Sequence, residues 1–386
     1  MRISCLQENL ARGLSMVSRA VATRSTLPVL GNVYVGTDGG RLKLMATNLE
    51  IGLSCWVGAR VEEEGAITVP ARLFEELVKQ SPPERIELEV DTRTETLHYR
   101  CGSLSASIKG IGASEFPIMP AADEAEGVRV RVDGDVMAEV VEQVVFAAAT
   151  DETRPVLTGV LVEFEEDRMT LAAADGFRLS VRSARLEGAV EAPLRVIVPA
   201  RAMGELGRIV KQVGGEILVI LTPNRNQVLF HMAEVDLVSQ LIEGTFPDYR
   251  LIIPKSFETR VVVDTARFLE TVRRALIFAR DAANIVRLQV GNAGGPAETH
   301  EQAARLVVRA EASETGSGEE AIPAAVEGAP LEIAFNGRYL MDVLSVVGSP
   351  QVALELTTPS SPGVFRPVGT ETEFTHVVMP MHLGGR

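Results

Sequence analysis

Val198-Pro199-Ala200-Arg201 occurs almost three times in this chain. Val69-Pro70-Ala71-Arg72 precedes it by 129 positions (201 − 72), and Phe335-Asn336-Gly337-Arg338 follows it by 137 (338 − 201). Each copy ends an apolar run that predicts a strand, and each opens a segment with helical spacing, where a proline is tolerated in the first turn. The interval indicates repeated domains, because the units of a solenoid run only about 20 to 50 residues.

Other landmarks repeat at nearly the same interval. Arg154–Gly159 follows the similar stretch Leu27–Gly31 by 127 positions (157 − 30), and Phe246-Pro247 follows Phe116-Pro117 by 130 (246 − 116). Asp175-Gly176-Phe177 takes the place of Asn48-Leu49-Glu50. We therefore predict an α+β fold with two helices packed on antiparallel sheet in each copy. The predicted domains are 1–124, 125–254 and 255–386.

Apolar stripes mark the faces that the predicted helices bury. The stripes are Leu10, Leu14, Val17 and Val21; Met137, Val140, Val141, Val144 and Val145; Leu73 and Leu77; Met203, Leu206, Val210 and Val213; Phe268, Leu269, Val272, Leu276 and Ala279; and Leu340, Val343, Leu344 and Val347. Two stretches of the last third, Gly291–Pro296 and Ala312–Gly328, are rich in Gly, Ser, Glu and Ala. Their composition predicts hairpin loops.

Composition bounds the class of protein. The chain has 386 residues, 46% of them hydrophobic and 23% charged, and its net charge is 38 − 52 = −14. Such a balance argues against a polyanionic partner only if the cations are evenly spread. Three cysteines without a CxxC pair, Cys5, Cys55 and Cys101, and no signal-peptide pattern predict a reducing, cytoplasmic setting. No apolar run approaches the roughly 18 residues of a membrane span.

The chain lacks the residue patterns of an enzyme or a metal protein. Its five histidines are scattered without ligand spacing, and no nucleophile elbow, Walker loop or dinucleotide fingerprint occurs. Gly291–Pro296 is glycine-rich, but no Gly-Lys-Ser/Thr follows it. We expect no catalytic residue, no metal and no cofactor.

Cations recur on the predicted outer faces of several helices. Arg12 and Arg19 lie opposite the first apolar stripe, an arrangement that a solvated face also explains. Similar placements predict a loosely basic lining that meets phosphates without reading bases and suits a sliding contact. The candidate DNA-facing residues are Arg12, Arg19, Arg201, Arg208, Lys211, Arg267, Arg274 and Arg338.

Two apolar features lie off the core pattern. Ile277 and Phe278 fall outside their helix's apolar stripe, which indicates either an interface or a covering loop. The C-terminal Met379-Pro380-Met381 cannot wholly continue a strand, because proline lacks the N–H donor. Methionines beside a proline form an adaptable apolar surface.

Taken together, four stretches resemble the β subunit of bacterial DNA polymerase III, the sliding clamp, over essentially the full length. They are Arg24–Asn32, Asp175–Leu179, Phe246–Arg250 and Val377–Leu383. The resemblance implies a DNA-clamp fold and a head-to-tail homodimer, with six domains closing a ring around duplex DNA. It also implies that a clamp loader places the ring using its own ATP, and that the clamp is a processivity factor without a catalytic centre.

The family resemblance also implies three sets of site residues. Arg24 matches the family's DNA-touching arginine, and Ile108, Ile277 and Phe278 match its dimer contact. A hydrophobic pocket should receive short peptides from the replicative polymerase, the clamp loader and other proteins. The matching pocket positions are Arg154, Leu157, Ala174, Gly176, Phe177, Arg178, Leu179, Pro247, Ile252, Val377, Val378, Met379, Pro380, Met381 and Leu383.

Departures from the family pattern affect the expected specificity. Phe177 and His382 stand where other members often carry His and Arg, so the peptide preference should differ. Pro155 and Val156 stand where some members have tyrosines that face DNA and the pocket, so the gating role of those tyrosines is not carried over to this chain. The alternative function is a multidomain adaptor that binds peptides but never encircles DNA.

Overall fold

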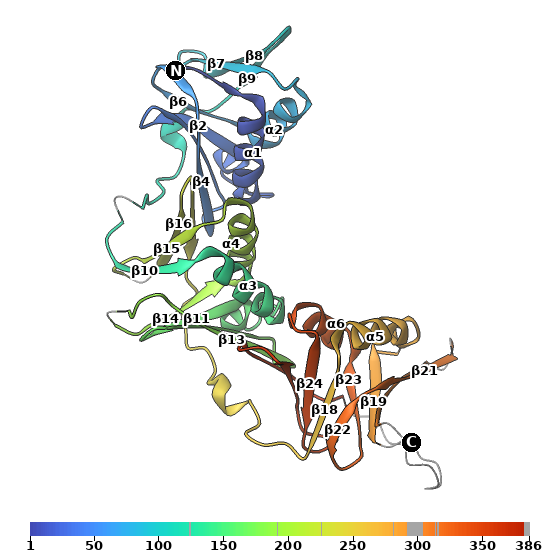
Figure 1. Cartoon of the computed structure of the whole chain (residues 1–386). Helices are drawn as coiled ribbons and strands as arrows, with labels where there is room; N and C mark the ends of the chain where they lie inside the picture. Colours follow the sequence, from blue (N-terminus) through green and yellow to red (C-terminus); the bar gives the residue numbers. More distant parts are fainter. Residues whose placement is uncertain are drawn as a thin grey trace. The chain divides into compact units, whose positions relative to one another are not determined.

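The computed structural model describes residues 1–122, 125–190, 192–224, 226–280, 282–291, 304–312, 314 and 316–381. The chain forms two compact units: unit 1 is Met1–Ala138 with Arg201–Glu243, and unit 2 is Glu139–Ala200 with Gly244–Arg386. Each unit therefore combines segments from successive thirds of the sequence. Figure 1 follows the helices and strands along the chain.

Unit 1 contains two sheets. The five-stranded sheet has the order β5 (Arg60–Glu63), β1 (Arg2–Leu6), β7 (Arg85–Asp91), β8 (Thr96–Cys101) and β9 (Leu104–Lys109). The eight-stranded sheet has the order β10 (Val128–Asp133), β15 (Glu216–Leu221), β16 (Gln227–Met232), β17 (Val235–Gln240), β4 (Ile51–Val57), β3 (Arg41–Thr47), β2 (Asn32–Asp38) and β6 (Ala66–Pro70). Because β17 pairs antiparallel with β4, this sheet joins the first two sequence thirds.

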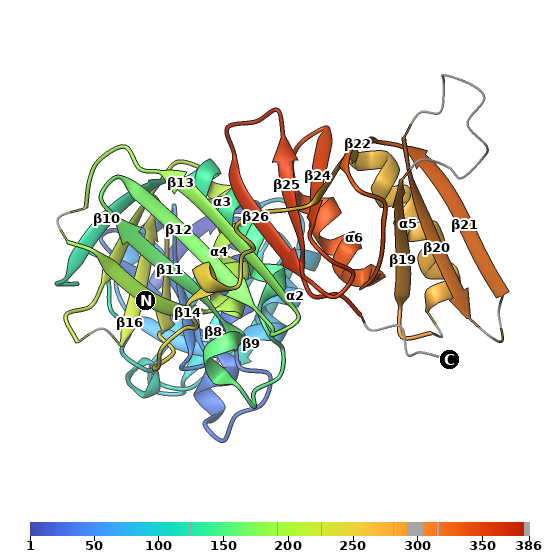
Figure 2. The same ribbon diagram turned by 90° about the horizontal axis from the view of Figure 1, so that it is seen from below.

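Unit 2 repeats the scheme. The nine-stranded sheet has the order β14 (Leu194–Pro199), β11 (Gly159–Glu165), β12 (Arg168–Ala174), β13 (Arg178–Arg185), β26 (Glu373–Val378), β25 (Gly363–Val368), β24 (Gln351–Leu356), β18 (Thr259–Asp264) and β22 (Ala325–Gly328). The four-stranded sheet has the order β21 (Gly316–Pro323), β20 (Arg305–Ala312), β19 (Ile285–Gly291) and β23 (Leu331–Asn336). Figure 2 shows β26 beside β13, where the C-terminal strand joins the middle third of the chain.

The described residues form six α-helices and six short 3-10 helices. The α-helices are α1 (Gln7–Val17), α2 (Ala71–Gln80), α3 (Gly134–Val144), α4 (Ala200–Val213), α5 (Thr265–Ala279) and α6 (Gly337–Val346). The 3-10 helices are η1 (Ser18–Ala20), η2 (Pro28–Gly31), η3 (Ala113–Glu115), η4 (Val145–Ala147), η5 (Pro155–Thr158) and η6 (Tyr249–Leu251).

All three copies of the repeated stretch are strand-to-helix transitions. Strands β6, β14 and β23 lie at sheet edges and lead directly into α2, α4 and α6. Pro70 and Pro199 end their strands, one residue earlier than the expected first helical turn, and an edge strand tolerates a residue without an N–H donor. In the third copy, Asn336 replaces proline and caps α6 through the Arg338 N–H.

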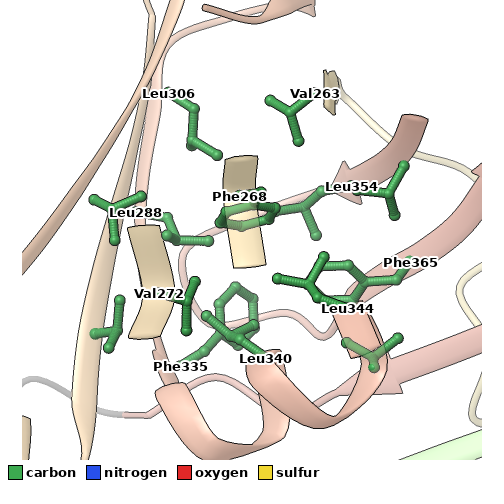
Figure 3. Packing of buried hydrophobic residues seen from close by; sticks show 14 of the residues in the cluster. Val263, Phe268, Val272, Leu288, Leu306, Phe335, Leu340, Leu344, Leu354 and Phe365 are labelled. Carbon is green, nitrogen blue, oxygen red and sulfur yellow. The ribbon is translucent and has the colours of Figure 1, made fainter. Parts of the chain in front are cut away.

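The core of the last third lies between α5 and α6 and strands of both sheets. Figure 3 shows Phe268 of α5 surrounded by aliphatic and aromatic side chains from these elements. Phe335 and Phe365 meet edge to face, with ring centroids 6.5 Å apart. The predicted stripes of α1, α4 and α6 are buried as expected, apart from the partly exposed Val21 and Val213.

The expected face of α2 was wrong. Ala71, Phe74 and Val78 are buried, whereas Leu73 is 54% exposed. The buried residues follow the i, i+3, i+7 spacing of one helical face, and Phe74 removes more apolar surface from water than a leucine. Leu73 and Leu77 are four residues apart, a spacing that is also typical of a buried helical face, and this led to the wrong prediction.

The interpretation of Ala312–Gly328 as a loop was also wrong. Residues Gly316–Pro323 form β21, which pairs with β20 from Ala312↔Gly316 to Arg305↔Pro323, and Ala325–Gly328 form β22. The composition of Gly316–Pro323 disfavours a strand in isolation. The segment is nevertheless a strand because every residue of it pairs with β20 and because Ile322 is buried. Residues 292–296 of the other glycine-rich stretch lie outside the described residues.

Candidate functional site

The turn between β12 and β13 is held by its own aspartate. The Asp175 Oδ1 accepts the Phe177 N–H at 2.8 Å and the Arg178 N–H at 3.0 Å. Gly176 has φ +93°, a backbone conformation that favours glycine, and a Cβ there would lie 2.9 Å from the Arg154 Nη1 and displace the end of that side chain. The turn is therefore fixed, and it leaves the Phe177 ring 60% exposed.

The Arg178 guanidinium anchors this turn to α6. Its Nε lies 3.0 Å from the Asp175 Oδ2, its Nη1 lies 2.5 Å from the Asp342 Oδ2, and its Nη2 donates to the Phe146 carbonyl at 2.7 Å. The guanidinium also stacks over the Tyr339 ring at 4.4 Å. With most of its donors engaged, Arg178 positions the turn and is not free to serve as a mobile charge.

The C-terminal segment completes one wall. Strand β26 pairs with β13 through Arg178↔Val378 and Leu179↔Val377. The Met379 N–H then donates to the Phe177 carbonyl at 2.8 Å, and the Met381 N–H donates to the Ala334 carbonyl at 2.8 Å. As predicted, the strand ends before Pro380.

The predicted pocket residues divide into a buried floor and an exposed rim. The buried residues are Leu157, Ala174, Leu179, Val377 and Val378. The exposed apolar ones are Phe177, Ile252 and Met379, of which Met379 is 40% exposed. Arg154 lies beside Gly176 and donates to the Asp175 carbonyl at 3.0 Å. Buried apolar residues beside exposed apolar ones suit the side chains of an extended peptide better than a charged ligand.

Two of the predicted pocket residues come from a different segment of the chain. Pro247 and Ile252 lie on the segment before β18, where the Tyr249 hydroxyl donates to the Glu163 Oε2 at 2.9 Å. Among the described residues, no hydrogen bond joins Pro247 or Ile252 to the β12–β13 turn. Leu383 and His382 lie outside the described residues.

Sequence reasoning missed a buried histidine next to the predicted pocket residue Val377. His376 of β26 is fully buried among the rings of Phe146, Phe365 and Phe374, and its Nδ1 lies 2.6 Å from the Ser180 Oγ. Burial, with a smaller contribution from Arg178, lowers the pKa of His376 to about 3. The Nε2 has no partner among the described residues. Phe374 and Val378, two positions before and after His376 on the same strand, gave the only sequence signal for this burial.

Sequence reasoning also missed Phe146, Tyr339 and Asp342. They come from η4 and α6, far in sequence from the turn that they hold. The ion pairs of Arg178 with Asp175 and Asp342 were not predicted from the sequence.

In unit 1, the predicted DNA-facing cations have unequal freedom. Glu205 lies 3.3 Å from the Arg19 Nη1 and 2.6 Å from the Arg208 Nη1, and the Arg201 Nη2 donates to the Arg19 carbonyl at 3.5 Å. Arg12 donates to the Asn9 side chain. Arg24 is exposed and has no ion pair among the described residues. Lys211 lies on α4, near the end of the helix.

In unit 2, Arg274 is the most constrained predicted cation. Its Nε and Nη2 each lie 2.8 Å from Glu320 carboxylate oxygens, so strand β21 neutralises much of its charge. Arg267 and Arg338 are exposed in the first turns of α5 and α6, and the ion pairs of the described residues include neither side chain. These two remain available to phosphates.

The predicted dimer-contact residues differ in accessibility. Ile277 is 62% exposed, but Ile108 is only 4% exposed because it faces the core side of β9. Phe278 is half-buried, with its ring against Gly318 of β21. Of these three residues, only Ile277 therefore presents the exposed apolar surface that was expected. Phe278 is instead partly covered by β21 of the same chain, which was the alternative interpretation.

The described residues contain no group of three or more His, Cys, Asp or Glu residues placed to hold a metal ion. None of the helices in the described part of the chain has the length and apolar composition needed to cross a membrane.

Comparison with known families defines the class of this fold. Residues 1–120, 131–248 and 250–382 match the N-terminal, central and C-terminal domain models of the DNA polymerase III beta subunit. The chain is therefore a three-domain clamp protein, and it belongs to the DNA polymerase III beta subunit family, the beta sliding clamps. Members of this family are processivity factors without catalytic activity of their own.

Individual relatives agree with this assignment. The beta sliding clamp of Synechococcus elongatus is 34% identical and covers 99% of this chain and 100% of its own. The solved sliding clamp of Bacillus subtilis is 27% identical, with a TM-score of 0.89 and 99% of each chain covered. That of Pseudomonas aeruginosa, bound to griselimycin, is 29% identical, with a TM-score of 0.90 and 99% and 100% covered. The expected family and α+β clamp fold are thereby confirmed.

Proposed function

We propose that two copies of this chain close head to tail into a ring around duplex DNA and tether the replicative polymerase and other DNA-processing proteins. Each chain supplies three domains, with boundaries at 1–124, 125–254 and 255–386. Family membership over the full length supports the ring. The single observation that carries the tethering role is the Met379–Phe177 hydrogen bond, which joins the C-terminal tail to the turn of an apolar pocket.

The pocket suits peptides that bind and leave readily. Burying two apolar anchors contributes roughly 3 to 6 kcal/mol, less than the about 8 kcal/mol of micromolar binding. Backbone hydrogen bonds must supply the rest. The polymerase, the clamp loader and other partners therefore exchange on one site, and the ATP that opens the ring belongs to the loader.

The proposed DNA contact is weak because few of the predicted cations are both exposed and unpaired. Arg12, Arg24, Arg267 and Arg338 remain exposed, whereas Glu205 and Glu320 reduce the charge of their neighbours. A few phosphate contacts give sequence-independent, salt-sensitive binding that permits sliding.

The dimer contact uses open sheet edges. Strands β9 and β21 each end their sheets, so each presents unpaired backbone groups to a second copy. The exposed Ile277 supports an apolar contact beside such an edge. The free, buried cysteines Cys5, Cys55 and Cys101 are consistent with a cytoplasmic location.

The pocket assignment is tested with Met379→Ala and Leu179→Ala together. We expect the double variant to lose polymerase stimulation and to bind griselimycin at least about tenfold more weakly, because rim and floor contacts are both removed. Leu73→Ala, which removes an exposed leucine of α2, is the matched control and should keep both. The dimer mass should not change in either variant. Unaltered stimulation in a folded double variant would refute the assignment.

A further inference from the structure

The turn between β3 and β4 in unit 1 repeats the pocket turn of unit 2. The Asn48 Oδ1 accepts the Glu50 N–H at 3.0 Å and the Ile51 N–H at 2.8 Å, as Asp175 does in unit 2. The Asn48 N–H donates to the Ile51 carbonyl at 3.2 Å, and the corresponding bond at Asp175 measures 3.3 Å. Two turns with one hydrogen-bond pattern thus exist in the chain.

In both units, the strand that lies beside the turn is attached in the same way. Strand β17 pairs with β4 as β26 pairs with β13. The Gln240 N–H donates to the Glu50 carbonyl at 2.9 Å, and the Met379 N–H donates to the Phe177 carbonyl at 2.8 Å. The contact that joins tail and turn in the peptide pocket is therefore duplicated.

The third element, a short 3-10 helix, is duplicated as well. In unit 1, the Leu30 N–H donates to Leu27 at 3.2 Å and the Leu30 carbonyl accepts from Ala22 at 3.1 Å. In unit 2, the Leu157 N–H donates to Arg154 at 2.9 Å and the Leu157 carbonyl accepts from Ala149 at 2.8 Å. We name the two sets the unit 1 frame (Ala22, Leu27–Gly31, Thr47–Gly52, Gln240) and the unit 2 frame (Ala149, Arg154–Thr158, Ala174–Leu179, Met379).

The two frames differ at the floor. Leu179 is the buried floor residue of the unit 2 frame, and Gly52 takes its place in the unit 1 frame. The missing side chain is replaced from elsewhere: the Met119 Cε lies 2.6 Å, and its Sδ 3.1 Å, from the point that a Cβ of Gly52 would occupy. Met119 also packs on the cluster of Val29, Leu30 and Phe116. It remains partly exposed, so its side chain is not confined to the floor.

Met119 reaches Gly52 because its segment departs from the repeat. Phe116-Pro117 corresponds to Phe246-Pro247, and both phenylalanines are buried. Beyond them, Tyr249 of the second copy turns to Glu163, whereas Met119 of the first copy enters the frame. The Met119 side chain thus occupies a space in the unit 1 frame, and the corresponding residue of the second copy, Tyr249, points elsewhere.

The rim of the unit 1 frame combines two leucines with two polar residues, because the exposed Glu50 and Gln240 take the places of Phe177 and Met379. Leu27 and Leu49 replace Arg154 and Gly176, and each is 50% exposed. Leu49 has φ +76°, a left-handed conformation that leucine rarely adopts. Half-exposed leucines, one of them in strained backbone, are typical of a surface that contacts an apolar ligand.

We propose that the unit 1 frame is a second, latent site for an aliphatic side chain of a linear peptide, and that Met119 keeps it closed by occupying it in cis. The inference rests on the proposed function of the unit 2 frame as the open peptide pocket. Each chain then offers one open site, and release of Met119 creates another.

The test measures peptide binding to the full chain by NMR of 13C-labelled methionine methyl groups. The probe is a Gly-Ser decapeptide with two leucines, and the control peptide carries serines instead. Met379 reports on the unit 2 frame, and Met45, which packs on the same cluster as Met119, reports on the unit 1 frame. In the wild type, we expect saturable shifts at Met379 alone.

Met119→Ala should add a saturable shift at Met45, with binding at least about tenfold tighter than in the wild type, because an aliphatic side chain gains the vacated space. Gly52→Ala, whose added methyl displaces the flexible Met119 end, should open the site by a different route should Met119→Ala fail to fold. Ile118→Ala, at a fully exposed neighbour, should behave as the wild type.

The outcomes separate the two proposals. An unmoved Met45 in a folded opened variant that still shows the Met379 shift would overturn the latent site alone. Absence of the Met379 shift in the wild type would overturn the peptide pocket, and a Met45 shift in the untouched wild type would overturn closure by Met119.

Discussion

Acidification should loosen the strand that precedes Met379 in the proposed peptide pocket. His376 of β26 has a pKa lowered to about 3 by burial, against about 6.5 in an unfolded chain. Since the open strand binds a proton more readily than the closed one, stability is full above pH 6.5 and is lost as the pH falls from 6.5 towards 3. The loss should reach about 1.4 kcal/mol at pH 5.5 and about 2.7 kcal/mol at pH 4.5.

Amide hydrogen exchange measures this effect where it acts. The Met379 N–H, bonded to the Phe177 carbonyl, should lose protection about tenfold at pH 5.5 and about a hundredfold at pH 4.5 relative to pH 7.5, after correction for the intrinsic exchange rate. His376→Gln keeps a polar group for Ser180 but does not titrate, so its protection should change little over this range. His98→Gln, at an exposed histidine, should follow the wild type. Equal pH dependence in His376→Gln and the wild type would refute the reasoning.

Three further predictions concern other parts of the chain. Ile322→Ala should lower the free energy of unfolding of unit 2 by about 2 to 5 kcal/mol in urea denaturation, because the side chain is fully buried between β21 and the core; a loss below 0.5 kcal/mol would make β21 a loop in solution. Asp342→Asn should destabilise by about 1 kcal/mol or less at low salt, since the Asp342 side chain is 36% exposed, and the effect should shrink in high salt because the pair with Arg178 is electrostatic. Arg24→Glu should shorten retention on circular DNA severalfold and leave the dimer mass unchanged in sedimentation, whereas unaltered retention would remove Arg24 from the DNA face.

The repeated strand-to-helix transitions were predictable because local residue types determine them. Apolar runs ending in Pro70, Pro199 and Asn336 carry both the strand and the helix start. The same holds for α1, α4 and α6, whose stripes contain several apolar residues per turn. Helix α2 was misjudged because its exposed Leu73 is as apolar as a buried residue, and only tertiary packing shows that Phe74 and Val78 face inward.

Features that depend on residues far apart in the chain could not be predicted from the sequence. Strand β21 exists because β20 pairs with it, and its glycines and glutamates gave no local signal. The same limit applies to the site: the turn at Asp175 and the tail at Met379 were predictable, but their support by Asp342 and Tyr339 was not. Ile108 matched a family contact by position, and only its pairing within the sheet shows that its side chain is buried.

Retention on DNA circles tests the central claim most directly. The chain is loaded by a clamp loader and ATP onto nicked plasmid and separated from free protein by gel filtration at moderate salt. The proposed ring predicts that twice the 41.6 kDa chain mass stays with each loaded circle and is released when a single-cutting nuclease linearises the DNA. Equal retention on linear and circular DNA, or retention as a monomer, would contradict encirclement.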